Sequence, residues 1–312
     1  MSLEVINLSK KYGPVVAVES LSFSMEKPGI YALLGTNGAG KTTAIRMMLG
    51  MLAKDGGSVL WNGKELTAQT CNIGYLAEER GLYPKYELLE QLMYFASLRG
   101  VPAAKAEERI KYWAGRLEVE EYLYPPRIGK GKRPKPRTAD QLSKGNQQKI
   151  QLMTALLSDP ALLVLDEPLS GLDPVNTDIF RSIIHEQLEA GKYLIMSSHQ
   201  MATVEEFCTD LTILHRSKAV LQGNLNEIKR GLGRVKLHVK VQQDIRPLIA
   251  QEGIELVSEK EYEYELKICR EEQAHRLLGA LVSQGVPVIS FLLREPSLHE
   301  IFVGIAGDTH EA

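Results

Sequence analysis

A glycine-rich stretch near the N-terminus has the residue types needed to bind phosphate. Residues 35–42 read Gly-Thr-Asn-Gly-Ala-Gly-Lys-Thr and fit the pattern G-x-x-x-x-G-K-[ST]. The apolar run Ile30–Leu34 precedes them, so a buried strand should lead through this loop into a helix that begins near Lys41. A glycine-rich turn that carries a lysine by chance is the alternative, but it does not explain the full pattern in this context.

The chemistry of such a loop follows from its backbone. Glycines let N–H groups close around phosphate oxygens, and the helix N-terminus adds partial positive charge. Lys41 should reach the β- and γ-phosphates of a nucleotide, and the Thr42 hydroxyl should hold Mg²⁺. The expected phosphate-binding residues are Gly35, Asn37, Gly38, Gly40, Lys41, Thr42 and Thr43.

A second candidate site is a pair of adjacent carboxylates after an apolar strand. Residues 162–165 are Leu-Leu-Val-Leu, and Asp166 and Glu167 follow them. Asp166 can approach Mg²⁺ through water, and Glu167 can polarise a water that attacks the γ-phosphate. A capped strand end with a solvated acidic pair is the alternative, and the phosphate loop upstream argues against it. The two sites together predict a P-loop ATPase or GTPase.

The segment Leu142–Gln148 reads Leu-Ser-Lys-Gly-Asn-Gln-Gln and lies upstream of the acidic strand. It resembles the L-S-G-G-Q signature of ABC ATPases in a variant form. Ser143 could supply a hydroxyl, and Gly145 a backbone N–H at a helix start, to a γ-phosphate. The resemblance implies that this phosphate is bound by the opposite subunit of a dimer.

Other motifs of the same family follow in order. Ser170–Asp173 resembles the D-loop, and His199, after the strand Tyr193–Ser197, resembles the switch histidine that contacts the γ-phosphate. Tyr12 matches the aromatic residue that stacks on adenine, although a tyrosine at a strand edge is also common in protein cores. The resemblance covers about residues 2–225 and implies ATP hydrolysis with Lys41, Glu167 and His199 as catalytic residues.

The chain departs from this family at the position where a glutamine is usual after a strand. Glu78 stands there, in the run Glu-Glu-Arg-Gly-Leu-Tyr. A carboxylate can still reach Mg²⁺ or its water, so the expected metal-binding residues are Thr42, Asp166 and Glu78. This run, the signature variant and the closing segment Glu295–Phe302 resemble ABC-2-type exporter ATPases of the sodium-efflux and drug or antibiotic-resistance types.

The elements that must position these residues form an α/β protein with a second unit. We expect an ABC nucleotide-binding domain over residues 1–230, with a P-loop core, an antiparallel β-subdomain near the N-terminus and a helical subdomain over about residues 88–157. Apolar strands on either side of the helical stretch Pro174–Ala190 imply parallel pairing with both faces covered. Alternating strands and an amphipathic helix over Glu271–Ser283 predict a small α+β domain over residues 231–312.

Composition restricts the function classes. The 312 residues carry a formal net charge of −2, whereas a general nucleic-acid binder is usually basic, so no nucleic-acid partner is expected. No stretch reaches the ~18 apolar residues that cross a bilayer, and no signal peptide is recognisable. A membrane role therefore requires a partner, and we expect a cytoplasmic protein at the inner face of the membrane. Cys71, Cys208 and Cys269 lack metal-ligand spacing.

The family resemblance implies two partners, an integral-membrane permease and a second ATP-binding subunit, either the same chain or a paralogue. The candidate permease contacts are residues 80–87, and export is the expected direction. One alternative is a soluble ABC ATPase of translation or nucleic-acid maintenance, although such proteins carry paired cassettes, long coiled coils or zinc cysteines that this chain lacks. The other is a non-enzymatic subunit, which conflicts with the intact catalytic residues.

A basic, proline-containing segment, residues 125–137, precedes the signature. Its prolines exclude a regular helix or a central strand, so a solvated loop is expected. Its six basic residues would allow contact with anionic headgroups, a permease loop or nucleic acid. A surface insertion without a partner is the simpler interpretation.

Overall fold

The computed structural model describes residues 1–79, 81–126, 135–232 and 236–308. The chain separates into two compact units, Met1–Gln222 and Gly223–Ala312. The sequence places this boundary between residues 230 and 231, which lies inside helix α8 (Leu225–Leu232).

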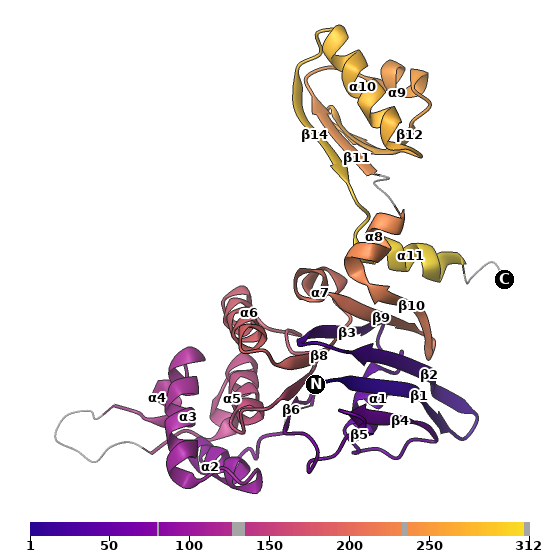
Figure 1. Cartoon of the computed structure of the whole chain (residues 1–312). Coiled ribbons are helices and arrows are strands. Elements are labelled where there is room, and N and C mark those ends of the chain that lie inside the picture. The colour runs from indigo at the N-terminus through magenta and orange to yellow at the C-terminus, as the bar shows by residue number, and fades with distance from the viewer. Residues whose placement is uncertain (80, 127–134, 233–235, 309–312) are drawn as a thin grey trace. The chain divides into compact units, whose positions relative to one another are not determined.

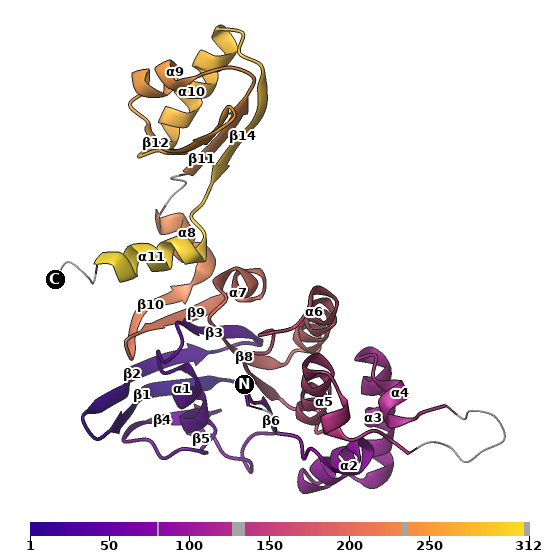
Figure 2. The same cartoon turned by 180° about the vertical axis from the view of Figure 1, so that it is seen from behind.

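The first unit is built on a six-stranded sheet in the order β10-β9-β3-β8-β7-β6 (Figures 1 and 2). The strands are β3 (Gly29–Gly35), β6 (Ile73–Leu76), β7 (Leu162–Asp166), β8 (Tyr193–Ser198), β9 (Asp210–His215) and β10 (Lys218–Asn224). β7 and β8 are buried along their whole length, as their unbroken apolar runs predict for strands covered on both faces. They pair in parallel, with Leu162 beside Tyr193. The prediction of parallel strands is therefore confirmed.

An antiparallel sheet in the order β2-β1-β4-β5 forms the expected β-subdomain. Its strands are β1 (Leu3–Tyr12), β2 (Val15–Met25), β4 (Gly56–Trp61) and β5 (Lys64–Glu65). Helix α1 (Lys41–Met48) lies against both sheets, so Leu3 and Val5 of β1 share one apolar core with Ile45 of α1 and Val164 of β7. This core fixes α1, and with it the loop that precedes the helix.

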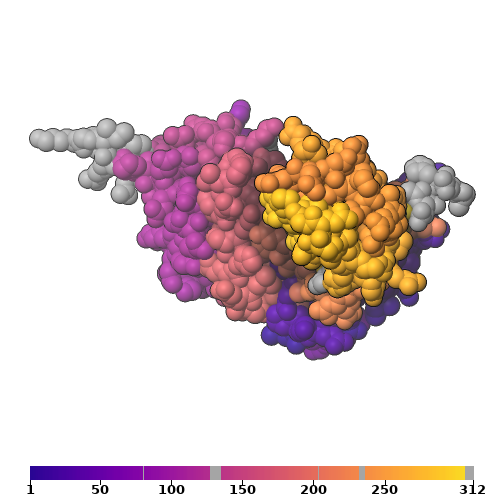
Figure 3. Space-filling model, turned by 90° about the horizontal axis from the view of Figure 1, so that it is seen from above, coloured from indigo at the N-terminus to yellow at the C-terminus, as the bar shows by residue number. Residues whose placement is uncertain are grey.

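The helical subdomain contains α2 (Leu88–Leu98), α3 (Ala103–Arg116), α4 (Glu120–Leu123), a 3₁₀ turn (Ala139–Gln141) and α5 (Lys144–Leu156). We expected a helix start at Gly145, and α5 begins one residue earlier, where the Ser143 hydroxyl caps it by accepting a hydrogen bond from Asn146 N at 3.3 Å. The remaining helices of the first unit are α6 (Pro174–Glu189) and α7 (Met201–Phe207). Arg116 of α3 and Glu186 of α6 form an ion pair at 2.8 Å. In Figure 3 the magenta surface that contains α3 lies beside the pink surface that contains α6.

The second unit has the strand and helix order of a split β-α-β fold. It contains β11 (Lys236–Val241), α9 (Arg246–Gln251), β12 (Glu255–Lys260), β13 (Glu263–Lys267), α10 (Glu271–Ser283) and β14 (Val288–Arg294). The strands form an antiparallel sheet in the order β12-β13-β11-β14, and one apolar core lies between this sheet and the helices α9 and α10. The small α+β unit expected from the alternating pattern is present.

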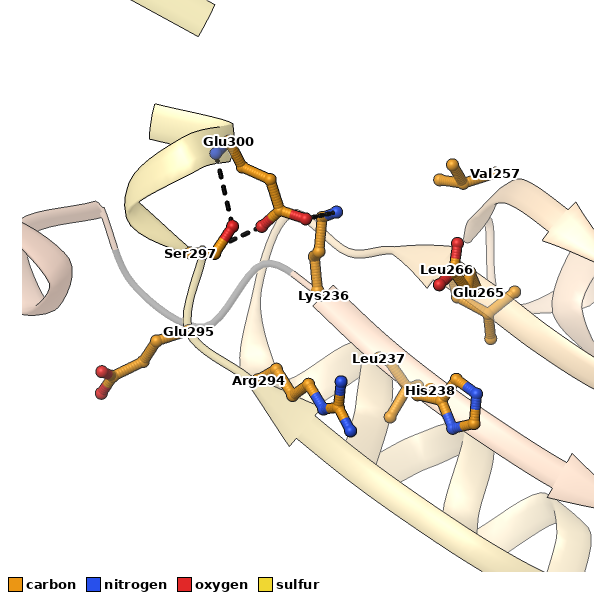
Figure 4. Close-up of a pocket in the computed structure, with 10 residues that line it drawn as sticks. All are labelled: Lys236, Leu237, His238, Val257, Glu265, Leu266, Arg294, Glu295, Ser297 and Glu300. Carbon is orange, nitrogen blue, oxygen red and sulfur yellow. Dashed lines mark hydrogen bonds and ion pairs between the residues drawn. The ribbon is translucent and has the colours of Figure 1, made fainter. Parts of the chain in front are cut away.

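The last helix, α11 (Leu298–Asp308), begins with a reciprocal cap. Ser297 N donates to Glu300 Oε2 at 2.9 Å, and Glu300 N donates to Ser297 Oγ at 3.3 Å. Glu300 also binds the Lys236 ammonium of β11, so one carboxylate fixes the helix start to the sheet (Figure 4). The sequence analysis identified this segment only by family resemblance and predicted neither α11 nor the short helix α9.

Candidate functional site

The glycine-rich loop connects β3 to α1, as its sequence pattern predicts. Gly40 caps α1 with a φ of 105°, and a Cβ atom at this position would lie 2.3 Å from the carbonyl oxygen of Ala17 on β2. Only glycine fits this close approach. No side chain caps α1, so the N–H groups of its first turn are available to an anion.

Lys41 is 6% exposed, yet its ammonium group has defined partners. Nζ donates to the carbonyl oxygens of Gly35 at 2.8 Å and Thr36 at 3.3 Å, and it lies 3.3 Å from Glu167 Oε1. The loop carbonyls and the carboxylate together hold a cation beside the phosphate loop, which is where a nucleotide phosphate would need it.

Asp166 ends β7 and is 1% exposed. Burial raises the pKa of its carboxyl, and hydrogen bonds from Ser197 and Thr42 offset only part of this effect, while the nearby Glu78 and Glu167 raise the pKa further. Both donors bind the same oxygen, Oδ1, Thr42 at 3.3 Å and Ser197 at 2.5 Å. Asp166 Oδ2 is buried without a hydrogen-bond partner. This oxygen is therefore free to bind a cation.

Glu167 turns sharply out of the strand with a φ of 51°, an unfavourable conformation for a residue other than glycine. Its side chain is 5% exposed and bridges two predicted catalytic residues. Oε1 faces the Lys41 ammonium, and Oε2 accepts a hydrogen bond from His199 Nδ1 at 2.8 Å. The structure thus brings Lys41, Glu167 and His199 together.

Lys41 and Glu167 border a cleft of about 360 Å³, within the range of about 300–1,000 Å³ found for ligand pockets. Most of the predicted phosphate- and metal-binding residues line it. The lining residues are Ala17, Asn37, Gly38, Ala39, Gly40, Lys41, Thr42, Thr43, Glu78 and Glu167. Gly35 contributes through its carbonyl bond to Lys41.

Besides Gly35 and Asp166, which adjoin the cleft through Lys41 and Thr42, three predicted binding residues do not line it. Ser143 and Gly145 lie at the start of α5, and a Cβ atom on Gly145 would lie 2.9 Å from Asn176 Nδ2 of α6. Tyr12 ends β1 with 50% of its surface exposed and the Lys10 ammonium 5.6 Å from its ring centre. If Ser143 and Gly145 bind nucleotide, they must bind a nucleotide that is held in the cleft of another subunit.

Ser197 is a further residue of the site that we did not predict from the sequence. Its hydroxyl accepts a hydrogen bond from Glu167 N at 2.9 Å and donates to Asp166 Oδ1. The available signal was the change from apolar residues to serine at the end of β8, two positions before His199. We predicted that strand but assigned no role to its polar end.

Two predicted interaction segments lie partly outside the described residues. Arg80 and residues 127–134 of the basic segment are among those that the structure does not describe. At the edge of the gap, the Lys135 ammonium lies 3.6 Å from Glu87 Oε1, and the Arg137 guanidinium lies 5.1 Å from the centre of the Tyr122 ring. Both described cations therefore have partners within the chain.

The donor set at the cleft fits a hard cation held mainly by oxygens outside the protein. Within the described ranges, no cluster of three or more His, Cys, Asp or Glu side chains could enclose a metal. The cleft instead offers Thr42 and Glu78, and the Thr42 hydroxyl connects it to Asp166, whose Oδ2 has no hydrogen-bond partner among the described residues. Mg²⁺ commonly takes one or two protein ligands with phosphate oxygens and water, so these residues fit it.

Comparisons with known proteins cover both units. Residues 18–170 match a family described as ABC transporter, and residues 223–306 match the C-terminal domain of ATP-binding protein DrrA1-3-like proteins. The uncharacterized ABC transporter ATP-binding protein YhaQ of Bacillus subtilis (strain 168) is 38% identical, over 99% of this chain and 100% of that protein. The linearmycin resistance ATP-binding protein LnrL of the same organism is 29% identical, over 98% of this chain and 99% of that protein.

A solved structure supports the same relationship. The structure of an ATP-binding subunit of an ABC transporter is 30% identical and superimposes with a TM-score of 0.65. It covers 75% of this chain and 94% of that one.

Proposed function

Because the chain belongs to the ATP-binding proteins of ABC transporters and carries a DrrA-like C-terminal domain, we propose that it drives export through a separate membrane permease. Proteins of this family are ATPases whose hydrolysis is coupled to transport. The observation that carries the proposal is the meeting of Lys41, Glu167 and His199 beside the phosphate loop. Export is supported by the full-length similarity to a resistance ATPase.

In the reaction, the oxygen of a water attacks the γ-phosphorus, and the bond to the oxygen bridging the β- and γ-phosphates breaks. Glu167 takes the water's proton, which ends on the released phosphate. His199 orients Glu167 through its Nδ1 hydrogen bond and would meet the γ-phosphate with the rest of its ring. Lys41 neutralises charge on the β- and γ-phosphates.

Mg²⁺ is part of the proposal, with Thr42, Asp166 and Glu78 as the residues that would hold it directly or through water. When bound, the ion would neutralise negative charge on the phosphates of the nucleotide. Support comes from Asp166 Oδ2, which is buried next to the Thr42 hydroxyl without a hydrogen-bond partner.

Dimerisation on ATP is the next part of the proposal. Ser143 and Gly145 do not line the cleft of their own chain, so a second copy or a paralogue would present them to the nucleotide. ATP would then hold the two subunits together as a dimer, and hydrolysis would let the dimer dissociate.

Light scattering of Glu167→Gln tests this step. In saturating ATP the variant should have twice the monomer mass, because it binds ATP and hydrolyses it slowly. The matched control, Glu167→Gln with Lys41→Ala, should stay monomeric because it cannot hold the phosphates. A monomeric single variant in saturating ATP would refute dimerisation of identical subunits.

The permease and the location at the inner face of the membrane are also proposed. None of the helices in the described part of the chain is long and apolar enough to cross a bilayer. The proposed contact surface is the segment beside Glu78, residues 80–87. A pull-down of tagged Glu167→Gln from gently solubilised native membranes with ATP should recover a polytopic membrane protein. Recovery of ribosomes or DNA instead would support the soluble ATPase, which the full-length match to a transporter ATP-binding protein disfavours.

A further inference from the structure

Three exposed tyrosine rings surround a hollow of about 380 Å³ at the start of the helical subdomain. Tyr83 and Tyr86 lie on the segment that follows Glu78, and Tyr94 lies on α2. Glu90 and Gln91 complete the lining, and we call these five residues the tyrosine cup. Tyr83, Tyr86 and Tyr94 are 50%, 62% and 50% exposed, respectively. Exposed aromatic rings around a hollow are typical of a binding site.

The cup is held in shape by one buried amide. Gln91 is 3% exposed, and its Oε1 accepts a hydrogen bond from Tyr83 N at 2.8 Å. Its Nε2 donates to the carbonyl oxygens of Tyr83 at 3.0 Å and Tyr86 at 2.9 Å. The tyrosine segment is therefore fixed to α2 without a ligand, which lowers the ordering cost of binding.

Ring contacts set the orientation of the cup walls. Tyr83 stacks on Phe95 with 6.1 Å between ring centres, and it meets Tyr86 at 66° with 5.8 Å between centres. The tyrosine rings that line the hollow are therefore not all parallel. Ring faces carry partial negative charge and attract a cation.

The negative charge of Glu90 also favours a cation in the tyrosine cup. Glu90 is the one charged residue that lines the hollow, and its carboxylate has no partner among the described residues. The neighbouring Glu87 is already paired with Lys135. Lys85 is exposed on the same segment but does not line the hollow. A carboxylate in a hollow lined by three tyrosines is complementary to a lysine or arginine side chain.

We propose that the tyrosine cup receives a lysine or arginine side chain from the permease, and this inference rests on the proposed transporter function. The segment that carries Tyr83 begins at Glu78 in the nucleotide cleft. Gln151 of α5 also holds it, donating from Nε2 to the Glu79 carbonyl oxygen at 3.2 Å. The cation would thus bind near Tyr83 and the nucleotide near Glu78, five residues apart in the sequence.

Photocrosslinking tests the proposal in the complete protein. Tyr86 is replaced by p-benzoylphenylalanine in native membranes, and the crosslinked peptide is identified by mass spectrometry. We expect a peptide of a polytopic membrane protein with a lysine or arginine within about one helical turn of the crosslink. Glu90→Lys should lower the yield about tenfold, and Glu90→Gln about threefold, as expected for a partly exposed cation site. Both variants should keep their basal ATPase rate, because Glu90 lies outside the nucleotide cleft.

Tyr262 of the second unit, 48% exposed, is the matched control position and should give no such crosslink. Crosslinks to a membrane segment without lysine or arginine, or a yield that Glu90→Lys leaves unchanged, would overturn the cation proposal. The same holds if Tyr86 gives no crosslink while the Glu167→Gln pull-down recovers a permease. If the pull-down also recovers none, the transporter function fails, and the cup proposal fails with it.

Discussion

Buried polar side chains are distributed unequally between the two units. All those within the described ranges belong to the first unit: Lys41, Gln91, Lys149, Asp166, Glu167, Gln187, Ser197, Ser198 and Thr212. The core of the second unit consists of apolar residues and Tyr264. Burying a charge lowers stability unless the charge is paired. The buried charged groups therefore lower the stability of the first unit, and the second unit has no such groups within the described residues. We therefore expect substitutions in the first unit to reduce ATP hydrolysis and core substitutions in the second unit to reduce stability.

The largest expected effect comes from Glu167→Gln. This change should lower ATP hydrolysis about 10²- to 10⁴-fold, the usual contribution of a general base, while ATP binding persists. Phosphate release against time measures it. The control is Glu263→Gln, which removes an exposed carboxylate beside Lys240 and His238 in the second unit and should leave the rate unchanged. Equal losses for both variants would contradict the division of roles.

A core deletion in the second unit should act on stability instead. Leu277 is fully buried on α10, and Leu277→Ala should destabilise that unit by about 2–5 kcal/mol. Hydrogen exchange in β11 and β13 should accelerate while exchange in β3 and β7 stays unchanged. Val282→Ala is the matched control because Val282 is 67% exposed on the same helix. Faster exchange in β7 would show that the two units unfold together.

Elements with a long apolar run or a strong helical periodicity were predicted well, and short elements were not. Long apolar runs and a helix with strong periodicity gave β7, β8 and α10 with nearly the observed ends. The six-residue helix α9 was missed because it is too short for a periodic signal and begins with a proline in its first turn.

At the candidate site, motifs predicted which residues would meet but not the contacts between them. Lys41, Glu167 and His199 are distant in sequence, and the pattern named all three. The hydrogen bonds of Ser197 to Glu167 and of Gln91 to Tyr83 were not predictable, because each depends on which backbone groups lie nearby in the tertiary fold. A single serine or glutamine carries no such information.

A smaller effect concerns the stability that the buried carboxyl group of Asp166 costs the protein. Burial raises the pKa of Asp166, so the folded protein binds this proton more tightly than the unfolded chain. Stability contributed by this group therefore falls as pH rises from the ordinary aspartate pKa through the raised value. At neutral pH, Asp166→Asn should raise the Tm of the nucleotide-free protein by about 2–4 °C, equivalent to about 1 kcal/mol.

The pH dependence provides the check. The stability difference between Asp166→Asn and the unmodified protein should widen between acidic and neutral pH. Asp178→Asn, which changes an exposed carboxylate near Arg181, should shift Tm little at any pH. A lower Tm for Asp166→Asn would show that the ionised carboxylate stabilises this fold.

The smallest effect concerns thiol reactivity. Burial raises the pKa of Cys71 to about 11, and Cys208 is also buried, whereas Cys269 of the second unit is exposed. A thiol reagent at neutral pH should label one site in the native protein, and Cys269→Ser should abolish this labelling. Rapid labelling of Cys71 would indicate that the core of the first unit opens readily.

The hydroxyl of Ser197 has a single proton, and this fixes the direction of a hydrogen-bond chain. Glu167 N–H can only donate, so the serine oxygen must accept there and give its own proton to Asp166. Asp166 Oδ1 must then be a pure acceptor, since a proton on it would face the serine proton. The hydrogen bond from Ser197 thus lowers the pKa of a carboxyl whose pKa burial raises. Loss of this one hydroxyl would remove that lowering and leave the amide of Glu167 without its acceptor.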